Sequence, residues 1–451
     1  MLEPLRESAY PPVAVKTLNL LETKIRDKSA NIGIIGLGYA GLPLAVAFAE
    51  AGYRVTGFDN QQSKVTSVNR GLSYVVDVSN HRLSSVTAGG LLEATDDKSR
   101  LRYADAICIC VPTPLTEARE PDLSYVSHES ETIAGYLRPG QLVVLESTTY
   151  PGTTRSLVLP ILESSGLHEG SDYYLAYSPE RVDPGTKGRD LRKTARVISG
   201  LSACSTRLAE LLYKQVIDKV VPVSSPEVAE MAKEFENVFR IVNIALTNEL
   251  AQLCDRMGIS VWEVIDAAST KPFGFMPFYP GPGVGGHCIP VDPHYLASKA
   301  RQYGFKTRFI ELAAEINEGM PGYAVSCIEK ALEARGKILK GARILVLGVA
   351  YKQDVADTRE SPALKLIQRL EECGAEVTHN DPYVGEVRVN GYCRNSVEIS
   401  QELLSSMDCV VIATAHSCYD PGQIAAWSNL VFDTRGVTNT LKANNVVRLG
   451  G

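Results

Sequence analysis

The sequence predicts an α/β protein in which two doubly wound domains are joined by a central helical region. From Asn31 onward, short apolar stretches alternate with helical patterns, which is typical of a parallel sheet covered by helices. Four strand-like stretches from the first third of the chain then recur, in the same order, in its last third. The matched pairs are 31–36 with 342–348, 53–59 with 375–382, 104–113 with 407–416, and 141–148 with 429–436. We therefore expect two Rossmann-like halves.

A chain of 451 residues is too long for one hydrophobic core, so several domains are expected. Helical patterns fill the middle: one long helix from Pro226 to about Gly258, then helices over 293–304 and 308–335, the last broken near 319–321. The middle is apolar on more than one side, which favours a homodimer or a higher homo-oligomer. The predicted domains are an N-terminal extension (1–29), a first Rossmann-like domain (30–222), a helical dimerisation domain (223–336) and a second Rossmann-like domain (337–451).

Composition argues against a nucleic-acid-binding protein, a membrane protein and a zinc protein. The formal net charge of −6 offers no basic surface for nucleic acid or an anionic membrane, and no apolar run approaches membrane-spanning length. The ten cysteines are scattered, with none in a C-x-x-C or zinc-type spacing. We therefore expect no metal site, free thiols and a cytoplasmic location.

A glycine-rich turn opens the first Rossmann-like domain. Gly36, Gly38 and Gly41 stand at G-x-G-x-x-G spacing between a strand and an apolar helix, and Asp59 ends the next strand. In this context the motif predicts a dinucleotide site, with the helix N-terminus at the pyrophosphate and Asp59 at the adenosine ribose. An acid there favours NAD over NADP. The alternative is the same βαβ unit without a ligand.

Later strands deliver further polar residues to the sheet edge at which open α/β sheets bind ligands. Pro112 and Thr113 end one strand, and Thr148 ends another, although such a hydroxyl can simply cap the next helix. Glu180 ends a third strand in a rigid proline-flanked loop and is a candidate acid or base. Its alternative role is a surface ion pair with Arg181.

The central helix places Lys233 and Asn237 four residues apart, hence on one face. Such a pair usually lies on a solvated helix face and has no special function. This helix is apolar almost all round, so a functional role for the pair is about as well supported as a solvated face. After the helix, the stretch 272–296 is rich in glycine, proline and aromatic residues, and it presents Cys288 four residues before Asp292. A loop of this kind can grip a polar ligand and offer it a thiol, or it can be a rigid connector with a buried cysteine.

The second Rossmann-like half lacks G-x-G-x-x-G and has G-V-A-Y-K-Q-D-V-A-D-T-R-E-S-P in its place. Tyr351, Lys352 and Arg359 in this segment suit a phosphorylated ligand other than a dinucleotide.

Seven motifs, in order from about residue 30 to the end, resemble the UDP-glucose/GDP-mannose dehydrogenase family. They are G-L-G-Y-A-G-L-P-L-A, V-P-T-P, E-S-T-T-Y-P-G-T-T, S-P-E-R-V-D-P-G, A-K-E-F-E-N-V-F-R, G-P-G-V-G-G-H-C-I-P-V-D-P and D-T-R-E-S-P-A. The stretch around Phe278 and Cys288 is most similar to the branch that oxidises UDP-N-acetylglucosamine to its uronic acid.

The resemblance implies that a sugar C6 alcohol is oxidised to a carboxylate with two NAD⁺, in polysaccharide biosynthesis. Cys288 would capture the aldehyde as a thiohemiacetal, from which a second hydride leaves to give a thioester. Lys233 and Asn237 would stabilise the oxyanion, Asp292 would orient lysine and water, and Glu180 with Thr148 would serve hydrolysis. The implied cofactor residues are Gly36, Gly38, Tyr39, Ala40, Gly41, Asp59, Pro112, Thr113 and Thr148. The implied substrate residues are Glu180, Arg181, Lys233, Asn237, Phe278, Tyr279, Gly281, Gly285, Lys352 and Arg359.

Two positions depart from the family pattern. Some relatives carry a second glutamate where this chain has Pro184, and some carry an arginine before the glycine loop, where Lys271 is the nearest basic residue. The substrate alternatives are UDP-glucose and the UDP-N-acetyl sugars of galactosamine and mannosamine. A one-step hydroxyacid-type dehydrogenase and a non-catalytic nucleotide-sugar or NAD sensor are the alternatives from other classes.

Overall fold

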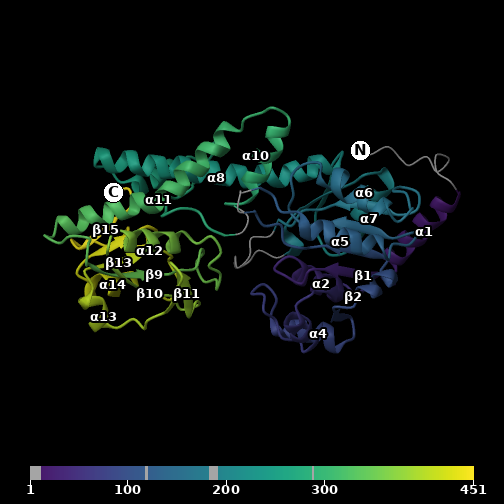
Figure 1. The fold of residues 1–451 in the computed structure, drawn as a ribbon, viewed down its shortest axis with the longest axis horizontal. Helices are drawn as coiled ribbons and strands as arrows, with labels where there is room; N and C mark the ends of the chain where they lie inside the picture. Colours follow the sequence, from purple (N-terminus) through teal and green to yellow (C-terminus); the bar gives the residue numbers. More distant parts are fainter. Residues whose placement is uncertain (1–11, 117–119, 182–190, 287–288) are drawn as a thin grey trace. The chain divides into compact units, whose positions relative to one another are not determined.

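The computed structural model describes residues 12–116, 120–181, 191–286 and 289–451 (Figure 1). The chain divides into two compact units, Met1–Glu236 and Asn237–Gly451, each described by itself. None of the helices within those described ranges is long and apolar enough to cross a membrane.

The N-terminal unit is built on one eight-stranded sheet in the order β3-β2-β1-β4-β5-β6-β7-β8. The strands are β1 (Asn31–Ile35), β2 (Arg54–Phe58), β3 (Leu92–Thr95), β4 (Ala106–Ile109), β5 (Leu142–Leu145), β6 (Tyr174–Tyr177), β7 (Arg196–Gly200) and β8 (Val220–Pro222). All neighbours are parallel except β6 and β7. The order 3-2-1-4-5-6 is that of a doubly wound sheet, and it reverses direction between β1 and β4. Ligands bind outside the carboxyl ends of the strands at such a reversal.

Helices cover both faces of this sheet. They are α1 (Pro12–Arg26), α2 (Gly41–Glu50), α3 (Gln62–Asn69), α4 (Asn80–Ala88), α5 (Ser124–Ala134), α6 (Leu159–Glu163) and α7 (Ala203–Tyr213). Helix α1 lies within the predicted N-terminal extension (1–29), and it belongs to the core of this unit. Leu21 and Ile25 are buried there, and the Tyr53 hydroxyl donates to the Ile25 carbonyl at 2.6 Å.

The C-terminal unit contains a five-stranded parallel sheet in the order β10-β9-β13-β14-β15 and a two-stranded hairpin. The strands are β9 (Arg343–Leu347), β10 (Glu376–Asn380), β13 (Cys409–Ile412), β14 (Val431–Asp433) and β15 (Val446–Arg448), with β11 (Glu386–Val389) and β12 (Tyr392–Asn395) in the hairpin. The order 2-1-3-4-5 is also doubly wound and reverses between β9 and β13. The predicted fold, with two Rossmann-like sheets and helices between them in the chain, is confirmed.

The long predicted helix is α8 (Pro226–Met257), which runs across the boundary between the units. The other helices are α9 (Val261–Ser269), α10 (Asp292–Gln302), α11 (Arg308–Glu333), α12 (Pro362–Glu372), α13 (Gln401–Ser406) and α14 (Pro421–Trp427). The predicted break near 319–321 is wrong, because α11 continues through Pro321. Met320 and Ala324 on either side of the proline are fully buried, so packing outweighs the hydrogen bond that proline removes.

Candidate active site

The glycine-rich turn after β1 has three glycines with different constraints. Gly36 has φ +89°, and a Cβ on it would lie 2.6 Å from the Cys110 carbonyl oxygen. A Cβ on Gly41 would overlap the Gly36 carbonyl, whereas a Cβ on Gly38 would meet nothing within 4 Å. The first and third glycines are therefore required by the turn itself. The second faces open space, as expected where a backbone approaches a pyrophosphate.

Asp59 lies directly after β2, next to this turn. Its buried carboxylate accepts hydrogen bonds from the Leu37 N–H at 3.0 Å and the Gln61 N–H at 2.9 Å, and Lys64 pairs with it at 3.3 Å. No side chain caps the N-terminus of α2 at Ala40. Together with the opening at Gly38, this arrangement fits a dinucleotide with an unphosphorylated ribose.

The loops after β4 and β5 are tied together at the reversal point of the sheet. The Thr113 hydroxyl donates to the Thr148 carbonyl at 2.9 Å, and the Ser147 hydroxyl donates to the Val111 carbonyl at 2.7 Å. Thr113 is buried, whereas Thr148 is half-buried and Pro112 and Tyr39 are exposed. The predicted cofactor residues Gly36–Gly41, Asp59, Pro112, Thr113 and Thr148 thus all follow the carboxyl ends of β1, β2, β4 and β5.

Glu180 follows β6, and its side chain is 18% exposed. Its carboxylate pairs with Arg196 at 2.7 Å and accepts a hydrogen bond from the Arg181 backbone N–H at 2.7 Å. The Arg181 guanidinium pairs instead with Glu236. Ion pairs thus join Glu180 to Arg196 and Arg181 to Glu236, whereas the alternative role expected from the sequence was an ion pair between Glu180 and Arg181. Arg196 escaped sequence analysis because it lies in an apolar strand with no motif around it.

Lys233 and Asn237 are both buried on α8, as their placement on an apolar helix suggested. The Asn237 side-chain amide donates to the carboxylate of Asp292, which is 1% exposed. Asp292 is the first residue of α10. The structure thus brings together two predicted catalytic residues, Asn237 and Asp292, that lie 55 positions apart in the sequence.

The glycine loop before Cys288 is anchored at both ends within the C-terminal unit. The Gly281 N–H donates to the side chain of the buried Asn248 at 3.0 Å, and Asn248 in turn donates to Asn317 at 2.8 Å. The Gly286 N–H donates to the Arg359 carbonyl at 3.0 Å. The predicted nucleophile Cys288 and its neighbour His287 lie outside the described residues.

Aromatic residues precede this loop. Phe278 is half-buried and meets Phe239 edge to face, with ring centroids 5.7 Å apart. Tyr279 is exposed and stacks on Trp262 at 6.0 Å, and the Trp262 N–H donates to the Leu449 carbonyl at 2.9 Å. These contacts hold both predicted substrate residues against rigid helices of the C-terminal unit.

The segment after β9 packs on the same glycine loop. A Cβ on Gly285 would lie 2.8 Å from the Tyr351 Cβ, so a side chain at that position would displace Tyr351. Lys352 is half-buried, and the exposed Arg359 guanidinium is held by Asp357 at 2.6 Å.

Arg435 is a further cation beside the loop that sequence analysis missed. A Cβ on Gly281 would lie 2.7 Å from the Arg435 Nη1, and the Arg435 Nε donates to the Ala413 carbonyl at 2.7 Å. Burial lowers its pKa to about 10, although Asp433 opposes the change. Its only signal in the sequence was the T-R-G that follows β14.

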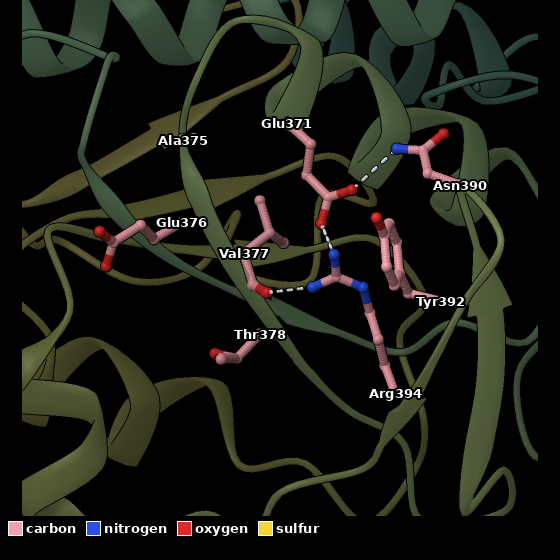
Figure 2. A pocket seen from close by; sticks show the side chains of 8 residues that line it. All are labelled: Glu371, Ala375, Glu376, Val377, Thr378, Asn390, Tyr392 and Arg394. Carbon is pink, nitrogen blue, oxygen red and sulfur yellow. Dashed lines mark hydrogen bonds and ion pairs between the residues drawn. The ribbon is translucent and has the colours of Figure 1, made fainter.

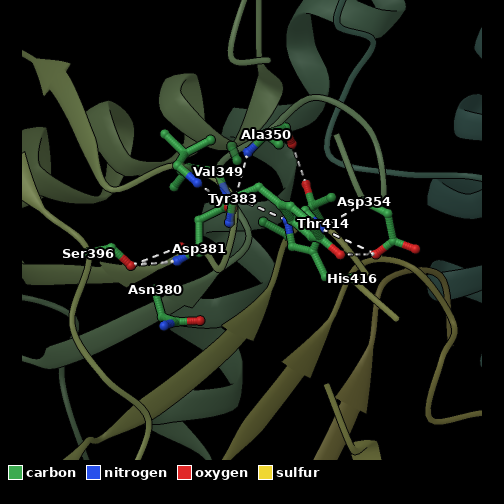
Figure 3. A network of polar contacts seen from close by, with 12 residues as sticks. Val349, Ala350, Asp354, Asn380, Asp381, Tyr383, Ser396, Thr414 and His416 are labelled. Atoms are coloured by element: carbon green, nitrogen blue, oxygen red, sulfur yellow. Dashed lines mark hydrogen bonds and ion pairs between the residues drawn. The ribbon is translucent and has the colours of Figure 1, made fainter. Parts of the chain in front are cut away.

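A polar network fills the reversal point of the C-terminal sheet (Figure 3). The buried His416 contacts Asp381 through Nε2 at 3.0 Å, and its Nδ1 accepts from the Asp354 N–H at 3.0 Å. A pocket of about 440 Å³ lies elsewhere in this unit, and its lining side chains are drawn in Figure 2. It is lined by Glu371, Ala375, Glu376, Val377, Thr378, Asn390, Tyr392 and Arg394, and by none of the predicted site residues.

Comparison with known proteins identifies the family. Three profiles of the UDP-glucose/GDP-mannose dehydrogenase family match the chain: the NAD binding domain over residues 30–217, the central domain over 227–319 and the UDP binding domain over 345–440. The UDP-N-acetyl-D-mannosamine dehydrogenase of Pyrococcus horikoshii is 39% identical over 387 residues, 85% of this chain and 89% of the relative. The chain belongs to the UDP-glucose/GDP-mannose dehydrogenase family.

Other relatives and solved structures agree. The UDP-N-acetyl-D-glucosamine 6-dehydrogenase of Pseudomonas aeruginosa is 37% identical over 86% of this chain and 91% of its own length. A solved structure of the Pyrococcus horikoshii UDP-N-acetyl-mannosamine dehydrogenase superimposes with a TM-score of 0.85 at 36% identity, covering 93% of this chain and 99% of that one. This family member is an NAD-dependent UDP-sugar dehydrogenase, as the resemblance implied.

Proposed function

We propose that the enzyme oxidises the C6 hydroxyl of a UDP-N-acetylhexosamine to the uronic acid in two hydride transfers. The buried hydrogen bond between Asn237 and Asp292 carries this proposal. It joins the helix that holds Lys233 to the helix that follows the cysteine loop in the chain, and so it links the predicted oxyanion-stabilising residues to the segment directly after Cys288.

When bound, NAD⁺ would supply the hydride acceptor, and a second NAD⁺ would replace the NADH before the second oxidation step. Loss of a hydride and a proton from the C6 alcohol gives an aldehyde, to which the Cys288 sulfur adds as a thiohemiacetal. Loss of a second hydride and proton gives a thioester. Water then cleaves the C–S bond, which releases the uronic acid and returns the thiol.

Each predicted catalytic residue has a role in this scheme. Lys233 and Asn237 stabilise the oxyanion at C6, and Asp292 orients the lysine and a water molecule. Glu180 takes a proton from the water that attacks the thioester, and Thr148 helps to order that water. Cys288 is the nucleophile.

The proposed binding residues fall into two groups, one for NAD⁺ and one for the UDP-sugar. In the N-terminal unit the glycine turn, Asp59 and the loops after β4 and β5 hold NAD⁺. For the UDP-sugar we assign the predicted set of Glu180, Arg181, Lys233, Asn237, Phe278, Tyr279, Gly281, Gly285, Lys352 and Arg359, and we add Arg435. The domain boundaries at 30–222, 223–336 and 337–451 stay a prediction.

Two sugars are the leading substrates. The sequence around Phe278 and Cys288 is most similar to the branch acting on UDP-N-acetylglucosamine, which we place first. UDP-N-acetylmannosamine is the second candidate, because relatives named for it reach 39% identity.

We also propose that the chain assembles as a homodimer through α8. Apolar side chains at heptad-like spacing are exposed on the part of α8 in the C-terminal unit, namely Phe239, Leu246, Leu250, Leu253 and Met257. An exposed apolar stripe of this length on a long helix is typical of a surface covered by a second copy.

The test is to count NADH formed per sugar consumed with UDP-N-acetylglucosamine, UDP-N-acetylmannosamine, UDP-glucose and GDP-mannose. We expect two NADH per UDP-N-acetylhexosamine and an acid product. Cys288→Ala should form no acid, whereas Cys373→Ala, at an exposed cysteine of the same unit, should behave as the parent enzyme.

Other outcomes would change the proposal. Two NADH with UDP-glucose alone would keep the mechanism and replace the substrate. One NADH per sugar, or full acid formation by Cys288→Ala, would contradict the cysteine mechanism.

A further inference from the structure

A buried arginine links Glu180 to a second carboxylate that the proposed mechanism does not use. Arg196, the first residue of β7, is 2% exposed. Its Nη1 donates to Glu180 at 2.7 Å, its Nη2 pairs with Glu146, and its Nε donates to the Ser178 hydroxyl at 3.1 Å. One guanidinium thus connects the residues that follow β5 and β6.

Glu146 is enclosed more completely than Glu180. It is 1% exposed, and its second oxygen accepts a hydrogen bond from the buried Tyr213 hydroxyl. The Arg196 guanidinium also lies over the Tyr213 ring, 5.3 Å from its centroid. Only the Glu180 end of this chain of contacts reaches solvent, at the carboxyl edge of the sheet where Thr148 also lies.

The cluster holds one cation and two carboxylates, so it carries an excess negative charge when both acids are ionised. Burial raises the pKa of Glu146; Arg196 opposes this change and the Glu180 charge adds to it. Because the two carboxylates share one guanidinium in a water-poor site, the charge on either one changes the proton affinity of the other.

The groups that face the cluster from neighbouring elements do not remove this excess. Cys108 and Cys110 of the β4 region have pKa values raised by burial, and burial also raises that of Tyr213 on α7, so all three stay neutral. Arg181, next to Glu180, is paired with Glu236 of α8. Among the contacts described for residues 12–181 and 191–286, those with Arg196 and, through it, Glu146 are therefore the ones that we expect to set the charge balance at Glu180.

We propose that Arg196 is a positioning residue that orients the Glu180 carboxylate, and that Glu146 tunes its basicity by competing for the same guanidinium. The inference rests on the proposed function, in which Glu180 accepts a proton during thioester hydrolysis. A carboxylate bound by an arginine and a backbone N–H is a weak base, because both contacts favour its charged form. A second buried carboxylate on the same arginine offsets that effect. Stability alone is a poor explanation, since a buried ion-pair cluster is often no more stable than apolar packing.

The first variant is Glu146→Gln, which keeps the shape and removes the charge. Without the neighbouring charge, Glu180 holds its proton less tightly. The acid limb of the pH profile for thioester hydrolysis should therefore move to lower pH, by about one unit. The rate of hydrolysis is measured by quenching single-turnover reactions at a series of pH values. Intact-protein mass spectrometry then gives the fraction of enzyme that still carries the sugar adduct.

The second variant is Arg196→Lys, which keeps the positive charge. It replaces the planar guanidinium, whose N–H groups reach both carboxylates, by a compact ammonium group that cannot bind both of them in the same geometry. Hydrolysis should slow about a hundredfold, and the thioester adduct should accumulate while both NADH of the turnover still form. If this variant does not fold, the Glu146→Gln profile alone decides the proposal.

Asp105→Asn is the matched control. Asp105 is a buried carboxylate at the opposite edge of the same sheet, paired with Lys24 at 2.9 Å and Arg138 at 2.8 Å. Its loss should lower stability without moving the pH limb. Coincident profiles for Glu146→Gln and the parent enzyme, or an equal shift in Asp105→Asn, would overturn the proposal. Failure of the proposed function looks different, because the parent enzyme would then give no thioester adduct at any pH.

Discussion

Asp59 and Asp381 occupy the same place in the two doubly wound sheets, yet they do different work. Each directly follows the second strand of its sheet, and each accepts hydrogen bonds from the loop after the first strand. Asp59 takes one such bond, from Leu37 at 3.0 Å, and one from Gln61. Asp381 takes two, from Val349 and Ala350 at 2.8 and 2.9 Å.

Asp381 then accepts three more donors. They are the N–H groups of Tyr383 and Val384 at 2.8 and 3.0 Å and the His416 imidazole at 3.0 Å. Burial alone would raise its pKa, but the hydrogen bonds from His416 and the backbone outweigh burial and hold the pKa below its usual value. Groups of the protein itself supply five donors to Asp381, whereas Asp59 accepts two backbone N–H groups and pairs with Lys64, and it is the aspartate that we propose to bind the ribose. One topology therefore yields a dinucleotide site in one half and an internal brace in the other (Figure 3).

The variant with the largest expected effect tests whether the turn after β1 binds NAD⁺. Gly38→Val places a side chain where the structure shows open space, so the turn should still fold. The side chain would keep the pyrophosphate away from the backbone, and kcat/KM for NAD⁺ should fall about a hundredfold. Gly385→Val, at a similarly open glycine of the C-terminal unit, is the control and should leave kcat/KM within a factor of two or so. A large loss of thermal stability in Gly38→Val would contradict the comparison.

Asp381→Asn tests the brace. The change removes a buried charge that holds five donors, and it should lower the free energy of unfolding of the C-terminal unit by about 2 kcal/mol in urea titrations. Asp59→Asn is the paired variant, with a smaller loss of stability and a clear rise in KM for NAD⁺. Equal stability losses without any change in KM would show that the two aspartates do the same work.

The smallest effect is an opposite response of the two halves to acid. Burial lowers the pKa of His379 in the C-terminal unit, so the folded state keeps this imidazole neutral while the unfolded chain protonates near pH 6.5. Stability of that unit is then lost as pH falls below about 6.5. Both tryptophans, Trp262 and Trp427, lie in this unit, so their fluorescence reports its unfolding. His379→Leu should remove the loss.

The N-terminal unit contains a carboxyl with the reverse behaviour. Burial raises the pKa of Glu230 to about 7, although the Thr154 side chain and backbone donate to it. A carboxyl whose folded pKa is raised adds stability that is complete below about pH 4.5 and is lost as pH rises through about 7. Tryptophan fluorescence does not report this change, because both tryptophans lie in the C-terminal unit. A loss of the tryptophan signal between pH 4.5 and 7 that persists in His379→Leu would therefore contradict the assignment to His379.

Local pattern was enough to predict much of this enzyme. Strands read as apolar runs, and the glycine spacing with Asp59 indicated the NAD site, because these features depend on residues close together in the chain. The pairing of Lys233 with Asn237 on one helix face followed from helical periodicity. The break predicted near 319–321 failed because the burial of Met320 and Ala324 depends on what the helix packs against.

The sequence by itself determined the two α/β halves, the family and the set of catalytic candidates, since each is written in a short motif. Only the tertiary structure decided which distant polar groups meet. Arg196 with Glu146 and Glu180, Arg435 beside Gly281, and His416 with Asp381 are brought together by strand order, and no spacing in the chain encodes such contacts. A buried charge must find its partner in space, so its role can be recognised only after the fold is known.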